Sequence, residues 1–212
     1  MDILIVAATA EEIDLTIKAW HTSDFRGSCV TKNIEFLVTG VGMTATAFAL
    51  GRELATKRYD LAINAGIAGA FDRSLKIGEV VSVNLDCFSE LGAEDGSAFI
   101  TIDELGLGKT SIKPEMPVEN FSLPFMKMAR SITVNKVHGC FESIFETVQR
   151  LNPQTESMEG GAFFYACNKM EIPCIQIRAV SNYVEQRNRA AWNIPLAIQN
   201  LNKLLQSLII RL

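Results

Sequence analysis

Apolar segments of strand length alternate with segments of helical periodicity along most of this chain. Runs rich in Ile, Val, Leu and Ala, which predict strands buried on both faces, occupy residues 2–8, 61–65, 79–89, 131–138 and 174–181. Apolar residues recur at helical spacing in residues 9–20, 43–57, 141–151, 159–170 and 191–209. This alternation predicts an α/β fold in which helices flank a mixed, largely parallel central sheet.

Two stretches depart from the alternation. Residues 28–39 are typical of two short strands around Lys32-Asn33, which predicts a hairpin. Residues 92–124 are rich in Gly, Pro and acidic side chains and predict a loop-dominated excursion. Neither stretch has the composition of a linker, and no internal repeat divides the chain. We therefore expect a single domain over residues 1–212.

The charge balance limits the possible partners. The chain has 20 Lys and Arg against 24 Asp and Glu, a net charge of −4, and no cluster of basic residues. Such a surface does not attract nucleic acid or an anionic membrane. The apolar run at 204–212 is too short to cross a bilayer. We expect neither nucleic acid nor a membrane as a partner.

Cysteine and histidine usage argues against disulfides, metals and cofactors. The five cysteines are odd in number and lack CxxC spacing, which favours free thiols and a cytoplasmic location. The apolar N-terminal run carries Asp2 and no basic residue, so it predicts a strand and not a signal peptide. His21 and His138 lie far apart without a Cys at zinc spacing. Gly40-Val-Gly42 lacks the third glycine of a dinucleotide fingerprint, and no phosphate loop is present. We predict neither a metal nor a cofactor.

Candidate chemistry lies where the predicted strands end, because ligands of such sheets bind beyond the carboxyl ends of the strands. Glu12 follows the first strand, Glu159 begins an apolar helix and Asn182 follows the last strand. Glycines 42 and 66 punctuate two further strand ends. No Ser/His/Asp or Cys/His combination accompanies them, which argues against acyl transfer.

Each candidate also has a structural interpretation. Thr9-x-x-Glu12 is a capping box, and Glu159 suits the positive end of a helix dipole, an effect worth about 0.3–1 kcal/mol. Asn182 can form an Asx-turn. Gly160-Gly161 costs a helix start about 1 kcal/mol per glycine relative to Ala, which favours close approach of another group there. The residues alone leave both interpretations open.

The motifs together resemble the nucleoside phosphorylase/nucleosidase superfamily in order and spacing. The resemblance rests on IVAATAEEI, VTGVGMTATAFALG, LAINAGIAGAF, KIGEVVSV, SMEGGAFFYAC and IPCIQIRAVSN. Within that superfamily the chain is most similar to the futalosine hydrolases, enzymes of an alternative menaquinone pathway. The features that favour this branch are SELGAED at 89–95, Ser181-Asn182, and RNRAAWNIPLAI at 187–198.

The resemblance implies catalytic roles for three residues. Glu12 matches the carboxylate that activates water. Glu159 matches the carboxylate that binds the ribose hydroxyls and helps to hold the water. Asn182 matches the position that contacts the N7 side of the purine.

The resemblance also implies a substrate-binding set. Met158 would pack on the sugar, and Phe141 is a candidate stacking partner for the base. Gly42, Gly66 and Ile67 lie in turns expected to line the site. Ile67 stands where some relatives carry Ser, and the strand-end motifs lack cations apart from Arg178. Both features favour water over phosphate as the nucleophile.

The amide of Asn182 bears on the identity of the base. Methylthioadenosine/S-adenosylhomocysteine nucleosidases typically carry Asp here, which can protonate N7 and accept from a 6-amino group. An amide cannot act as that acid, but it can donate to a 6-oxo oxygen or to N7. The resemblance and this amide predict hydrolysis of futalosine to hypoxanthine and dehypoxanthine futalosine.

Two alternatives stay open. One is an adenine-releasing nucleosidase acting on methylthioadenosine, S-adenosylhomocysteine or aminofutalosine. The other is a non-catalytic nucleoside-binding protein on the same fold, although binding alone does not need a carboxylate at the water site. The resemblance further implies a homodimer.

Overall fold

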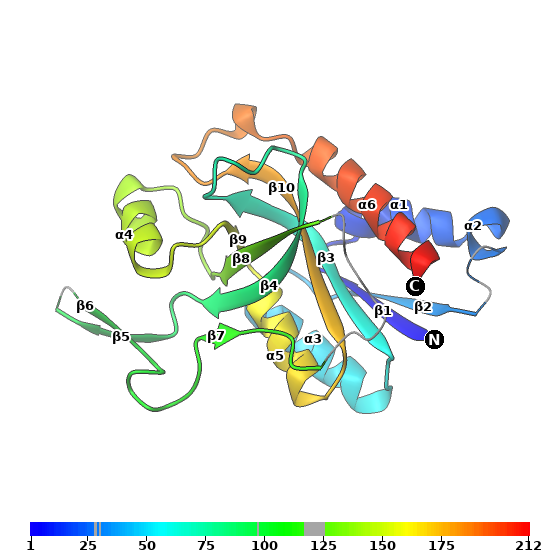
Figure 1. The fold of residues 1–212 in the computed structure, drawn as a ribbon, viewed down its shortest axis with the longest axis horizontal. Coiled ribbons are helices and arrows are strands. Elements are labelled where there is room, and N and C mark those ends of the chain that lie inside the picture. Colours follow the sequence, from blue (N-terminus) through cyan, green and yellow to red (C-terminus); the bar gives the residue numbers. More distant parts are fainter. Residues whose placement is uncertain (28, 30, 97, 117–125) are drawn as a thin grey trace.

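The structure is a computed structural model that describes residues 1–27, 29, 31–96, 98–116 and 126–212. Its main sheet contains β1 (Asp2–Ala7), β2 (Asn33–Val38), β3 (Leu61–Ala70), β4 (Val80–Phe88), β7 (Ser111–Ile112), β8 (Lys127–Thr133), β9 (Thr155–Ser157) and β10 (Cys174–Tyr183). The helices around it are α1 (Ala10–Trp20), α2 (Ser23–Gly27), α3 (Met43–Thr56), α4 (Phe141–Leu151), α5 (Gly160–Lys169), the 3-10 turn η1 (Arg189–Ala191) and α6 (Ile194–Arg211) (Figure 1). None of the described helices combines the length and the hydropathy needed to cross a bilayer.

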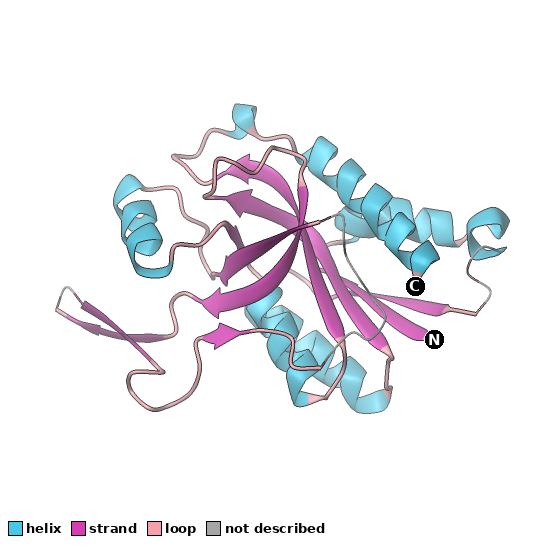
Figure 2. Cartoon of the chain, viewed as in Figure 1, coloured by secondary structure: helices cyan, strands magenta, loops and turns pink. Residues whose placement is uncertain are grey.

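β3 is the central strand of the sheet. β10 pairs in parallel along one edge of it, from residue 62 to residue 70. The other edge is shared by β1, which pairs in parallel at residues 61–64, and by β9, which pairs antiparallel at residues 69–70. Because β4 joins β10 to β8, and β8 joins β9, the strands β3, β10, β4, β8 and β9 close into a ring. β1 and β2 extend from this ring as a parallel wing (Figure 2).

Two helical layers cover the faces of the wing and of β3. Alternate residues of β1 point to opposite faces, as the two-residue period of a strand requires. Ile3 and Ile5 join the core formed with α1 and α6, whereas Leu4 and Val6 join the core formed with α3 and α5. Figure 1 shows the two helix pairs on opposite sides of the sheet. The predicted α/β fold class, with a largely parallel sheet between helices, is confirmed.

A buried amide ties α1 to α6. Asn202 Oδ1 accepts from the backbone N–H of Thr16 at 2.9 Å and from its hydroxyl at 2.7 Å. Asn202 Nδ2 donates to the carbonyl oxygen of Glu12 at 2.8 Å. The first turns of α1 are thus fixed by a residue of the last helix.

The hairpin predicted at 28–39 is wrong. β2 begins at Asn33, the residue expected in the turn, and runs parallel to β1 with Asp2 opposite Asn33. Residues 28 and 30 lie outside the described residues. A parallel edge strand is as short and as apolar as a hairpin strand, so the local pattern did not separate the two.

Other differences concern strand bounds. β3 continues through Gly66 to Ala70, and β8 ends at Thr133, so residues 135–140 form a loop. The excursion predicted at 92–124 contains a small hairpin, β5 (Gly92–Asp95) with β6 (Ala98–Thr101), and the short strand β7, while residues 97 and 117–124 lie outside the description. The three residues of β9 gave no sequence signal of their own.

Candidate active site

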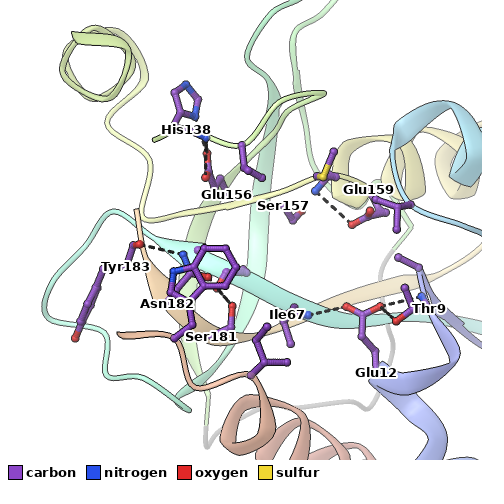
Figure 3. Close-up of a pocket in the computed structure, with 18 of the residues that line it drawn as sticks. Thr9, Glu12, Ile67, His138, Glu156, Ser157, Glu159, Ser181, Asn182 and Tyr183 are labelled. Carbon is purple, nitrogen blue, oxygen red and sulfur yellow. Dashed lines mark hydrogen bonds and ion pairs between the residues drawn. The ribbon is translucent and has the colours of Figure 1, made fainter. Parts of the chain in front are cut away.

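A cavity of about 480 Å³ opens at the carboxyl ends of β1, β3, β9 and β10. Five of the candidate residues line it: Glu12, Ile67, Met158, Glu159 and Asn182. The rest of the wall includes Thr9, Val41, Gly69, His138, Glu156, Ser157, Ser181 and Tyr183, and the outer part includes Glu185, Arg187 and Trp192 (Figure 3). The edge of the sheet that the sequence pointed to is therefore hollow.

Glu12 caps α1 and also faces the cavity. One oxygen of its buried carboxylate accepts from the backbone N–H of Thr9 at 3.0 Å, and the other accepts from that of Ile67 at 3.0 Å. The structural and functional interpretations of this residue therefore hold together, because the capping contact uses one oxygen. Burial raises the pKa of the Glu12 carboxyl, and the donated hydrogen bonds and the charge of Arg178 oppose the rise only in part. A raised pKa suits a proton acceptor that works near neutral pH.

A buried guanidinium lies beneath this carboxylate. Arg178 is 1% exposed; its guanidinium bonds the side chain of Asn64 and donates to the carbonyl of Ile177 at 3.1 Å. Burial lowers the pKa of Arg178, and the charges of Glu159, Glu12 and Asp86 raise it. These opposite charges compensate a cation that is costly to remove from water.

Gly66 supports the site from below. A Cβ placed on Gly66 would lie 2.9 Å from Glu12 Oε1 and 3.3 Å from Arg178 Nη1. Gly66 does not line the cavity; its lack of a side chain lets the carboxylate and the guanidinium lie against the backbone of β3.

Glu159 is held at the start of α5. Its Oε1 accepts from the backbone N–H of Gly42 at 3.0 Å, and its Oε2 accepts from that of Met158 at 3.3 Å. Gly42 has a φ of 96°, a left-handed conformation that favours glycine, and it too lies outside the cavity wall. Gly42 therefore acts as an anchor for Glu159.

The close approach expected at Gly160-Gly161 comes from the protein itself. A Cβ on Gly160 would lie 2.3 Å from Asp86 Oδ2, and one on Gly161 would lie 2.7 Å from the ring of Phe88. Asp86 is fully buried and accepts from Gln176 at 2.9 Å and from Thr133 at 2.8 Å. Burial raises the pKa of Asp86. The glycine pair thus lets α5 pack against a buried polar layer.

Asn182 lies beside an irregularity of β10. The register of β10 against β3 shifts between Val180 and Asn182, so that Ser181 is the extra residue of a bulge. The Ser181 hydroxyl lies 2.8 Å from Asn182 Oδ1 and 3.2 Å from the carbonyl of Ala68. Asn182 Nδ2 donates to the carbonyl of Tyr183 at 3.0 Å. The second N–H of the amide remains for a ligand.

The opposite wall contains a pair that the sequence did not reveal. His138 Nδ1 lies 2.6 Å from Glu156 Oε2, and the backbone N–H of His138 donates to Glu156 Oε1 at 3.1 Å. His138 Nε2 lies 2.9 Å from the hydroxyl of Thr147 in α4. Both residues line the cavity. The signal available was a histidine in the loop before α4 and an acid three residues before Glu159, but their pairing joins two loops.

Phe141 occupies a different place. Its side chain is 76% exposed, stacks on Phe145 at a centroid distance of 6.3 Å and does not line the cavity. It begins α4, as predicted, and presents its ring on the outer side of that helix. A stacking contact with a base in this cavity has no support from this placement.

The arrangement has two chemically different ends. Figure 3 shows Glu12 and Glu159 at one end, and Asn182, Glu156 and His138 toward the other. Two carboxylates near a buried guanidinium can hold and deprotonate water. An amide and a carboxylate at the far end can donate to and accept from a planar polar ring. A polar bicyclic base with an attached sugar fits such a division.

Comparisons with known proteins agree with this site. The chain matches the model of the Phosphorylase superfamily over residues 132–210. The futalosine hydrolase of Acidothermus cellulolyticus is 30% identical, over 93% of this chain and 86% of that protein. A 5'-methylthioadenosine/S-adenosylhomocysteine nucleosidase from Helicobacter pylori superimposes with a TM-score of 0.82 at 14% identity, covering 100% of this chain and 99% of that one. The native structure of futalosine hydrolase of Helicobacter pylori strain 26695 gives a TM-score of 0.81 at 15% identity, covering 100% and 98%.

The two kinds of match carry different weight. At 14% and 15% identity, the solved structures establish the fold alone, and their printed activities differ although the fold is shared. The identity of 30% across nearly the whole chain establishes the family. The chain belongs to the futalosine hydrolase family.

Proposed function

We propose that this protein hydrolyses the N-glycosidic bond of futalosine, releasing hypoxanthine and dehypoxanthine futalosine. The observation that carries the proposal is one cavity in which two backbone-anchored carboxylates, Glu12 and Glu159, face the amide of Asn182. The activity named for the relative from Acidothermus cellulolyticus supports the same substrate.

The reaction follows from the charges at the two ends. Water held between the carboxylates attacks C1′ of the ribose, and its proton passes to Glu12. The C1′–N9 bond breaks, and its electron pair leaves with the purine, which takes up a proton. The sugar passes through a cationic, oxocarbenium-like state, which the negative carboxylates stabilise. Glu159 is placed to accept hydrogen bonds from the ribose hydroxyls, and Met158 and Ile67 to pack against the sugar.

The leaving base is stabilised at the other end. Asn182 donates to the O6 or N7 edge of the purine as negative charge develops there. An amide cannot deliver a proton, so the departing base must be stable enough to leave with hydrogen bonding alone. A 6-oxopurine spreads the charge onto its oxygen, which supports hypoxanthine as the leaving group.

The mouth of the cavity supports a substrate with an aromatic acid on its 5′ side. The guanidinium of Arg187 lies 5.2 Å from the ring centroid of Trp192, and both line the outer part. The benzoate of futalosine combines a ring and a carboxylate, which these two side chains can meet. A methylthio group offers neither.

The runner-up is an adenine-releasing nucleosidase, which the likeness in fold to the methylthioadenosine/S-adenosylhomocysteine nucleosidase keeps in view. Asn182→Asp separates the two activities. If Asn182 selects the 6-oxo base, the variant gains activity on adenine nucleosides relative to futalosine. An unchanged ratio would remove Asn182 as the selecting residue.

Two further properties belong to the proposal. A homodimer is supported by the exposed apolar side chains Val137, Phe141 and Phe145 beside the site, and sedimentation velocity tests it. A cytoplasmic location is supported by the cysteines, all free. Cell fractionation with an antibody tests it.

The deciding experiment is a chromatographic assay of the purified protein with futalosine, aminofutalosine, methylthioadenosine and inosine, each with and without phosphate. Release of hypoxanthine from futalosine, independent of phosphate, is the expected result. Preferential release of adenine supports the runner-up, and a requirement for phosphate indicates a phosphorylase. Binding without release from any substrate indicates a non-catalytic nucleoside-binding protein.

A further inference from the structure

Gly69 lies between two polar side chains of neighbouring strands. In the pairing of β3 with β10 its partner is Asn182, and in the pairing of β3 with β9 its partner is Glu156. A Cβ on Gly69 would lie 3.4 Å from Asn182 Nδ2 and 3.4 Å from Glu156 Cγ. The two side chains therefore stand on the same face of the sheet, one on each side of an open position, and both line the cavity (Figure 3).

Glu156 is fixed as an acceptor. The side chain is 4% exposed and would be costly to bury as an ion without partners. The ring and the backbone N–H of His138 both donate to it, at 2.6 and 3.1 Å. Thr147 lies 2.9 Å from the second ring nitrogen, so a neutral imidazole with its proton on Nδ1 satisfies both contacts. Each carboxylate oxygen keeps a free lone pair.

The two groups form a donor and an acceptor side by side. Hypoxanthine has the matching pattern on one edge: O6 and N7 accept hydrogen bonds, and N1 carries a hydrogen. Adenine has the opposite pattern at the six-membered ring, with a 6-amino donor and an unprotonated N1. A carboxylate facing that bare N1 finds no donor and meets its lone pair.

We infer that Glu156 is a specificity-determining residue that accepts the N1–H of a 6-oxopurine while Asn182 donates to its O6–N7 edge, and that His138 is the positioning residue that holds Glu156. This inference rests on the proposed function, because it concerns the base that the same cavity releases. It adds a second contact and moves part of the selection from β10 to β9. A site built to bond one N–H rejects the analogue that lacks it by several orders of magnitude.

The central test is Glu156→Gln, assayed on futalosine and on its 6-amino counterpart aminofutalosine. Gln keeps the length and can still accept from His138, but it loses the charge and can present N–H to the N1 of adenine. Losing a hydrogen bond to a charged group lowers kcat/KM on futalosine by about 10- to 100-fold. The ratio of futalosine to aminofutalosine activity falls by at least as much.

Glu90→Gln is the matched control. Glu90 accepts from the backbone N–H of Asn135 at 3.2 Å, in the loop that carries His138, but it lies outside the cavity. The same chemical change there leaves the activity ratio as in the wild type. A fall in the ratio with Glu90→Gln would attribute the effect to the loop and overturn the inference.

The positioning role of His138 has its own readout. The side-chain nitrogen of Asn in His138→Asn can occupy the place of Nδ1 and donate to Glu156, whereas Ala in His138→Ala cannot. The activity ratio falls in His138→Ala and returns toward the wild-type value in His138→Asn. Equal ratios in the two variants would indicate that His138 acts only through the packing of the loop.

A ligand probe on the unaltered protein covers the case in which a variant does not fold. Free hypoxanthine, adenine and 1-methylhypoxanthine, which lacks the N1–H, are compared by isothermal titration calorimetry. Hypoxanthine binds more tightly than either of the others if Glu156 accepts N1–H. Equal binding of hypoxanthine and 1-methylhypoxanthine overturns the inference.

Failure of the inference and failure of the proposed function give different results. If the wild type releases hypoxanthine from futalosine and Glu156→Gln keeps the wild-type ratio, the inference fails and the function stands. If the wild type does not release hypoxanthine, the function fails. The calorimetric preference for hypoxanthine and its loss in Glu156→Gln then decide the inference alone.

Discussion

The two ends of the cavity are held by different kinds of contact. At the carboxylate end, Glu12 and Glu159 are bonded by backbone N–H groups of Thr9, Ile67, Gly42 and Met158. At the amide end, Asn182 and Glu156 are held largely by other side chains, those of Ser181 and His138. Backbone donors stay in place when nearby side chains change, whereas side-chain donors do not. The chemistry of the site is therefore the more robust part, and the choice of base the more easily altered.

The largest expected effect breaks the carboxylate end. Glu12→Gln removes the proton acceptor, and loss of a general base lowers kcat by about 10²- to 10⁴-fold. The preference for futalosine over aminofutalosine is expected to persist in the residual activity, because the amide end is untouched. Steady-state assays on both substrates measure this.

Asp14→Asn is the control for that variant. Asp14 lies on the same helix and pairs with Lys18 on the exposed surface, so activity and preference stay at wild-type levels. A changed base preference in Glu12→Gln would contradict the separation of the two ends.

A smaller effect comes from adding one methyl group beneath the carboxylate. Gly66→Ala places a Cβ 2.9 Å from Glu12 Oε1 and 3.3 Å from Arg178 Nη1, so the carboxylate must move. A misplacement of about 1 Å can cost about 10²-fold in rate. The free energy of unfolding falls by about 1–3 kcal/mol, as for other overpacked sites. Activity assays and denaturant titration measure the two effects.

Gly51→Ala is the matched control for Gly66→Ala. Gly51 lies within α3, and a Cβ there has nothing within 4 Å. Alanine in a helix interior raises stability by about 0.5–1 kcal/mol over glycine and leaves the activity unchanged. Wild-type activity in Gly66→Ala would show that the carboxylate tolerates displacement, which would weaken the backbone-anchored picture.

The smallest expected effect is in the pH profile. Burial raises the pKa of Glu12, and the ionised form is the active one, so kcat/KM falls on the acid side from a pH above the ordinary glutamate range. The sign for stability is the reverse. A folded-state pKa above the unfolded one contributes stability at low pH, and this contribution is lost as pH rises through the folded pKa. An acid limb at the ordinary glutamate pKa would remove Glu12 as the base.

Sequence patterns predicted the carboxylate end better than the amide end. Glu12 and Glu159 stand next to strand and helix ends, where short-range patterns are strong. The pairing of Glu156 with His138 could not be foreseen, because β9 has three residues and joins β3 only through the ring closure. Glycines showed the same limit: Gly42 and Gly66 were expected to line the site, but they anchor it from outside the wall.

Asn202 connects the order of synthesis to the assembly of the site. It bonds the carbonyl of Glu12 across a sequence separation of 190 residues. Contacts of such long range form late, because closing the loop costs entropy before the contact is gained. A nascent chain therefore emerges with its first helix unclamped, and the catalytic base reaches its final position only after α6 has been translated and has docked.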